Sequence, residues 1–115
     1  MNILEKSREF SLMELYKLIN DPHITQLKNH IGEVLEVTGF ALREEDEKRI
    51  LSLELAEGDV VASNSPTVQK SFAAILALYA SVGQDPFPMS LLVYTAPSTK
   101  NRDRNFVDIL LVESK

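Results

Sequence analysis

Residues 60–83, VVASNSPTVQKSFAAILALYASVG, contain a complete transition from a strand into a helix. The apolar run at residues 60–62 predicts a short strand. Ser65 is a preferred helix N-cap, and Pro66 suits the first helical position, where its missing N–H costs nothing. Gly83 is placed to end the helix with a left-handed cap. Apolar side chains at helical spacing predict that one face of this helix is core: Val68, Phe72, Ile75, Leu76, Tyr79 and Val82.

Strand patterns flank this unit on both sides. Val34 to Leu42 alternates between apolar and polar residues, and Gly39 interrupts it, which predicts a bulge or sharp bend. Ile50 to Ala56 alternates in the same way and predicts a second strand. After the helix, Met89 to Ala96 and Asn105 to Glu113 predict two more strands. The series is therefore three strands, one helix and two strands.

That order predicts the fold class. Five strands with a helix between the third and the fourth are the chain order of the OB-fold, a small and partly open barrel. We therefore expect a mainly β protein with helices, an OB-fold-like β-barrel of order β-β-β-α-β-β preceded by a short N-terminal helix. Such barrels often hold single-stranded nucleic acid, although a fold alone does not fix a function.

The residues before this series predict an appendage. Residues 1–10 are expected to be a mobile or loosely docked lead-in. Ser11 and Glu14 have the spacing of a capping box, which predicts a helix that ends at the run Asn20-Asp21-Pro22. Residues 23–33 fit neither pattern. We expect an N-terminal helix and lead-in over residues 1–30 and an OB-like barrel domain over residues 31–115.

The composition limits the function classes. The chain has 115 residues and no cysteine, so disulfides, thiolate metal sites and cysteine nucleophiles are excluded. Residues 1–10 are charged throughout and lack the apolar run of a signal peptide. The apolar runs are strand-sized and far too short to span a membrane. We expect a protein of the bacterial (host) cytoplasm that does not bind a membrane.

Charge is distributed unevenly along the chain. The formal net charge of −5 argues against a generally basic nucleic-acid-binding protein. The stretch between Ser98 and Phe106 nevertheless carries three cations against Asp103 alone, whereas residues 44–47 are all acidic. Both stretches fit ordinary solvated loops. They also fit an acidic body that directs one basic loop at phosphates.

No catalytic or cofactor motif is present in the sequence. Four scattered glycines cannot form a phosphate-binding loop, and no serine–histidine–acid motif occurs. His23 and His30 are the only histidines, and without cysteine they make a poor metal site. We therefore expect neither an enzyme nor a metal or cofactor site.

Binding of a single strand is better supported. It requires cations along a groove and aromatic rings on which bases stack. In OB-folds the face of strands two and three and the loops one–two and four–five form the binding surface. The residues of these types in those regions are the candidate site: Phe40, Arg43, Arg49, Tyr94, Lys100, Arg102, Arg104 and Phe106.

Residues 60–72 also resemble a segment of small single-stranded DNA-binding proteins from bacteriophages and prophages of Gram-positive bacteria. Residues 7–11 (SREFS) and 37–40 (VTGF) are similar to that family as well. Its fourth and fifth strands are joined by a serine-containing glycine–arginine turn followed by an aromatic residue. Ser98, Lys100, Arg102, Arg104 and Phe106 occupy that region here, without the glycine. The resemblance implies an OB-like barrel that coats single-stranded DNA during phage replication, without sequence specificity or a cofactor.

Two other functions fit the same sequence. An acidic protein-interaction module would inhibit a host nuclease or defence protein by covering its basic DNA-binding surface, and Glu44–Glu47 favours that interpretation. A structural or assembly protein would use an open barrel edge to form a homo-oligomer. The expected partners are thus single-stranded DNA, replication or host proteins, or a second copy of the chain.

Overall fold

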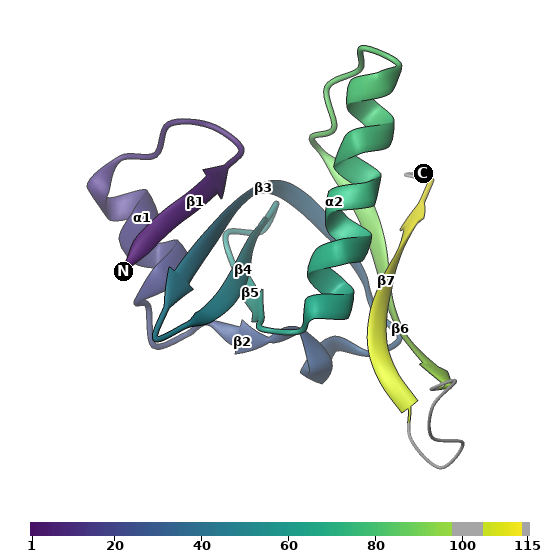
Figure 1. Cartoon of the computed structure of the whole chain (residues 1–115), viewed down its shortest axis with the longest axis horizontal. Helices are drawn as coiled ribbons and strands as arrows, with labels where there is room; N and C mark the ends of the chain where they lie inside the picture. Colours follow the sequence, from purple (N-terminus) through teal and green to yellow (C-terminus); the bar gives the residue numbers. More distant parts are fainter. Residues whose placement is uncertain (98–104, 114–115) are drawn as a thin grey trace.

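The strands of this protein form a single, strongly curled sheet (Figure 1). The computed structural model describes residues 1–97 and 105–113. Within those ranges the elements are β1 (Asn2–Lys6), α1 (Leu12–Ile19), β2 (Thr25–Gln26), the 3₁₀ helix η1 (Leu27–His30), β3 (Val34–Glu45), β4 (Lys48–Leu55), β5 (Val60–Ser63), α2 (Pro66–Ser81), β6 (Met89–Pro97) and β7 (Asn105–Val112).

The predicted fold class is confirmed. The five predicted strands are β3 to β7, and α2 lies between the third and fourth of them. Along the sheet the order is β2-β5-β4-β3-β6-β7, with β1 paired to β3 beside this path. All pairs are antiparallel except β2 with β5. The sheet is a half-barrel compatible with an OB-like fold, because β2 and β7 remain at its two edges in the described ranges.

The acidic cluster lies at the tip of the β3–β4 hairpin. Glu44 and Glu45 are the last residues of β3, and Asp46 and Glu47 connect the two strands. Asp46 has φ of 51° and Glu47 has φ of 65°. Two successive left-handed residues are characteristic of a type I′ turn, whose twist matches that of the strands. The two strands therefore extend further than their sequence patterns predict.

The predicted irregularity at Gly39 is confirmed as a bulge. The pairing of β3 with β4 shifts between Val37 and Gly39, so β3 has one extra residue there. A glycine is also required because there is no room for a side chain at this position. A Cβ atom at residue 39 would lie 2.6 Å from Nη1 of Arg8 and 2.9 Å from Oγ of Ser7.

Residues 1–10 are not a mobile lead-in. Residues 2–6 form β1, which pairs antiparallel with the end of β3. Ser7 continues this attachment: its N–H donates to the carbonyl of Phe40 (3.0 Å), and its Oγ accepts from the N–H of Phe40 (2.9 Å). The expectation was wrong because four of the five side chains of β1 are exposed, so this edge strand has no alternation between buried and exposed residues. The capping box of α1, Ser11 with Glu14, is confirmed.

The main core lies between α2 and one face of the curled sheet. Every strand from β3 to β7 contributes to it, together with Val68 and Phe72 of α2. The rings of Phe72 and Phe40 meet edge to face with centroids 5.0 Å apart. Val82 was expected on this face, but it is 61% exposed because it follows the last turn of α2. No helix in the described ranges is long and apolar enough to cross a membrane.

Candidate nucleic-acid interface

The outer face of β3, β4 and β5 is partly covered by the N-terminal segment, defined here as residues 7–24. Successive strand residues point to opposite faces, so Ala41 and Val60 point away from α2. They form a second, smaller core with Leu18 of α1, and Phe10 packs against it. Strands two and three of an OB-like barrel are β4 and β5 here, and their outer face is where such barrels bind ligands. Part of that face is therefore closed by the chain itself.

Arg8 fastens the N-terminal segment to β4. Its two terminal nitrogens donate to the two carboxylate oxygens of Glu54 at 3.0 and 2.9 Å. Nη2 also donates to Glu14 at 3.1 Å, and the guanidinium lies 4.3 Å from the ring centre of Phe10. Thr38 donates its hydroxyl to Glu54 at 2.8 Å. This network links α1, β3 and β4 on the covered face.

Two carboxyl pKa values respond to this network. The hydrogen bond from Arg8 lowers the pKa of Glu54, with a smaller contribution from Thr38. The pKa of Glu14 is lowered first by the backbone N–H of Ser11 and then by Arg8. Both carboxylates are thus stabilised in their charged form, which is the form that holds Arg8.

Phe40 and Arg43 do not face a ligand site. Phe40 is 4% exposed and belongs to the main core, so its ring has no free face for a base. Arg43 is 8% exposed and donates to Oγ of Ser52 at 3.1 Å and to Glu45 at 3.4 Å. A guanidinium that is buried and already hydrogen-bonded is poorly placed to reach a phosphate. The expectation for both residues is corrected by their burial.

Tyr94 and Phe106 lie on the same face of the β6–β7 ribbon. Tyr94 is opposite Asp108, and Phe106 is opposite Ala96, two residues further along each strand. The hydroxyl of Tyr94 is 3.5 Å from Asp108, whose other oxygen accepts from Ser71 of α2 at 2.6 Å. Partial desolvation, followed by the charge of Asp108, raises the pKa of Tyr94. The hydroxyl of Tyr94 thus contacts a carboxylate that is also bound to α2, whereas Phe106 is 36% exposed.

Arg49 is the most accessible of the predicted cations in the described ranges. Its side chain is 64% exposed, and its Nε lies 4.0 Å from Glu44. An ion pair of that length and exposure holds a side chain only weakly. Arg43 and Arg49 are close in the hairpin but point to opposite faces. Arg43 is paired with Ile50, so these two residues share a face, and Arg49, the residue before Ile50, points to the other face.

The predicted loop cations Lys100, Arg102 and Arg104 lie outside the described residues. Their strand does continue into the described part: β7 begins at Asn105, one residue after Arg104. The position of these three side chains stays a prediction from the sequence.

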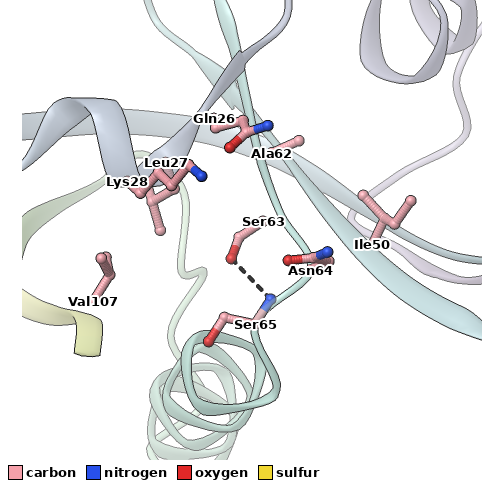
Figure 2. A pocket seen from close by; sticks show the side chains of 9 residues that line it. All are labelled: Gln26, Leu27, Lys28, Ile50, Ala62, Ser63, Asn64, Ser65 and Val107. Carbon is pink, nitrogen blue, oxygen red and sulfur yellow. Dashed lines mark hydrogen bonds between the residues drawn. The ribbon is translucent and has the colours of Figure 1, made fainter. Parts of the chain in front are cut away.

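A pocket of about 480 Å³ lies beside the end of β5, between η1, the β5–α2 connection and β7. Ile50 of β4 and Ala62 of β5 line it, and Val107 of β7 lies across from them (Figure 2). Its polar lining consists of Gln26, Lys28, Ser63, Asn64 and Ser65. Ile50 and Ala62 point to the outer face of their strands, so the pocket reaches the edge of the face that the N-terminal segment partly covers.

Asn64 lies directly before the N-cap of α2 and was not among the predicted site residues. The N-cap of α2 is Ser65, whose Oγ accepts from the N–H of Val68. The side chain of Asn64 is exposed and has no hydrogen bond to a described residue. No sequence pattern marked Asn64 as a site residue, and none marked Lys28, because residues 23–33 fit no regular pattern.

Both histidines contact side chains that are near them in the sequence. His23 contacts the carboxylate of Asp21 at 2.9 Å, and His30 lies between Thr25 (2.7 Å) and Glu33 (3.2 Å). Among residues 1–97 and 105–113, no three histidine, cysteine or acidic side chains gather as a metal site.

Comparison of the chain with protein-family models, with curated proteins and with solved structures finds no match. The function is therefore inferred from the fold and from the residues at its surface.

Proposed function

We propose that this protein binds single-stranded DNA without sequence specificity and acts in phage DNA replication or recombination in the bacterial host. The observation that carries the proposal is the pocket at the edge of the β4–β5 face of an OB-like half-barrel. Barrels of this class bind oligonucleotides on that face. The pocket also borders β7, the strand that follows the basic loop.

The chemistry of the surrounding residues suits this ligand. Phe106 directly precedes Val107 in β7, on the opposite face of the strand, and offers an exposed ring; stacking of a base on such a ring contributes roughly 1–3 kcal/mol. Lys100, Arg102 and Arg104 supply cations for phosphates directly before β7. None of these interactions selects a particular base, so binding without sequence specificity is expected.

Fluorescence anisotropy of a labelled thirty-nucleotide oligothymidine, titrated at low and at physiological salt, tests the proposal. We expect saturable binding that weakens as salt rises, because neutralised phosphates release counterions. Duplex DNA should bind much more weakly, since its bases cannot stack on protein rings. No binding at micromolar protein and low salt would refute the proposal.

The Arg102→Ala, Arg104→Ala double variant then tests the loop. We expect weaker binding and a shallower salt dependence. The matched control removes two charges elsewhere, at Lys6 and Lys17, and should bind like the unaltered protein. Equal behaviour of the two double variants would exclude the loop from the site.

A second candidate rests on the acidic hairpin tip. Glu44, Glu45, Asp46 and Glu47 are all exposed, as a surface that captures a basic host nuclease or defence protein requires. Two of them are partly neutralised within the hairpin, because Glu44 faces Arg49 and Glu45 faces Arg43. This makes the hairpin a weaker attractor than its sequence predicts, and DNA binding remains the function that the geometry favours.

A further inference from the structure

A second pocket, of about 850 Å³, adjoins the first one. It lies between the tip of the β3–β4 hairpin and the first turns of α2, on the other side of the β5–α2 connection. Asn64 and Ser65, which form that connection, line both pockets. The two pockets therefore adjoin on either side of the connection, and together they are called the groove here.

Unpaired lysines gather along this groove. Among the described residues, four lysines have no ion pair: Lys17, Lys28, Lys48 and Lys70. Lys28 lines the first pocket, and Lys48 and Lys70 line the second; only Lys17 lies elsewhere. All three groove lysines are exposed. An unpaired ammonium group on an exposed stem is free to meet a phosphate from several directions.

The groove is less acidic than the rest of the molecule. Its charged lining consists of Lys28, Lys48, Arg49 and Lys70 against Glu5, Glu44 and Glu47. Glu44 is already opposite Arg49 at 4.0 Å. Cations thus outnumber acids along the groove, although the whole chain has 12 basic and 17 acidic residues. A polyanion that approaches this acidic protein meets its least repulsive surface here.

We infer that single-stranded DNA follows this groove around the β5–α2 connection, with its phosphates on Lys28 at one end and on Lys48 and Lys70 at the other. The inference rests on the proposed function and specifies the site. The free side-chain amide of Asn64, at the bend, donates to the nucleotide that turns there. The strand therefore extends beyond the β4–β5 face to the hairpin tip and the first turns of α2.

Single lysine substitutions test this path with the same oligothymidine. The three variants are Lys28→Gln, Lys48→Gln and Lys70→Gln. Each should weaken binding several-fold. Each should also lower the slope of log K against log salt by about 0.7, the value for one phosphate contact on a single strand. Lys17→Gln is the matched control: it removes an exposed lysine that likewise has no ion pair and lies outside the groove, and it should change neither quantity. Asn64→Ala should weaken binding without changing the slope, because an amide releases no counterion.

The outcomes separate the path from the function. If the unaltered protein binds the oligonucleotide but the three groove variants keep its affinity and slope, the path is wrong and the proposed function stands. If Lys17→Gln lowers the slope as much as they do, binding follows overall charge and the groove is excluded. If the unaltered protein does not bind at all, the proposed function and the path both fail. Circular dichroism of each variant checks that these surface changes leave the fold intact.

Discussion

Gly39 shows how one residue couples the bulge to the N-terminal attachment. Its missing side chain leaves room for Arg8 and Ser7, and both side chains make hydrogen bonds that a Cβ atom would disturb. We predict that Gly39→Ala destabilises the protein by about 1–3 kcal/mol, the cost of disrupting hydrogen bonds to charged groups. Urea unfolding measures this loss. In an Arg8→Ala background the nearest obstacle is gone, so the same substitution should cost less; an equal cost in both backgrounds would contradict the explanation.

The same bulge explains why one candidate site residue was misassigned. Without an extra residue, Phe40 would point to the same face as Glu36 and Thr38, away from Leu35 and Val37. The register shift at Gly39 turns Phe40 onto the core face, opposite Leu53. The glycine predicts that a bulge is present, but which side chains it moves follows only from the pairing. A sequence pattern alone therefore cannot tell a stacking ring from a core ring at this position.

At the scale of elements, the sequence predicts those with a strong local pattern. The five strands and α2 follow from alternation, capping residues and a helical apolar stripe. β1 and β2 do not, because only one side chain of β1 is partly buried, and β2 has only two residues that are held by pairing to β5. The groove could not be predicted from the sequence either, because Lys28 and Lys70 are far apart in the chain. Only the fold brings them to adjoining pockets.

The attachment of the N-terminal segment should depend on pH. Because the folded-state pKa values of Glu14 and Glu54 lie below the ordinary value of 4.5, their ionised forms stabilise the folded state. That contribution is fully present above about pH 4.5 and is lost as the pH falls through the lowered values. We predict that the amides of α1 exchange with deuterium faster, relative to those of α2, when the pH is lowered from about 6 to about 4.

Glu54→Gln provides the control for this prediction. The amide cannot be titrated, so the variant should already show weakened protection of α1 near neutral pH and a smaller further change on acidification. A variant with the same pH dependence as the unaltered protein would show that another group controls the attachment.

At the scale of the whole molecule, a single main core joins both halves of the curled sheet. It draws side chains from every strand between β3 and β7, from η1 and from α2, so neither half buries its apolar face without the other. We expect one cooperative unfolding transition, with the same midpoint by circular dichroism and by tyrosine fluorescence. Phe72 is central to this unit, since it is 3% exposed and contacts Phe40 across the interface between helix and sheet.

Phe72→Ala should therefore cost about 3–5 kcal/mol, the usual price of truncating a buried phenylalanine. A loss of that size is a large part of the roughly 5–15 kcal/mol that stabilises a typical domain. Leu78→Ala is the matched control, because it truncates a large apolar side chain of the same helix that is 59% exposed, and it should change stability by no more than about 0.5 kcal/mol. Similar losses for the two variants in urea unfolding would mean that α2 does not pack on the sheet through the Phe72 face. Separate transitions for the two probes would instead mean that the halves of the sheet fold independently.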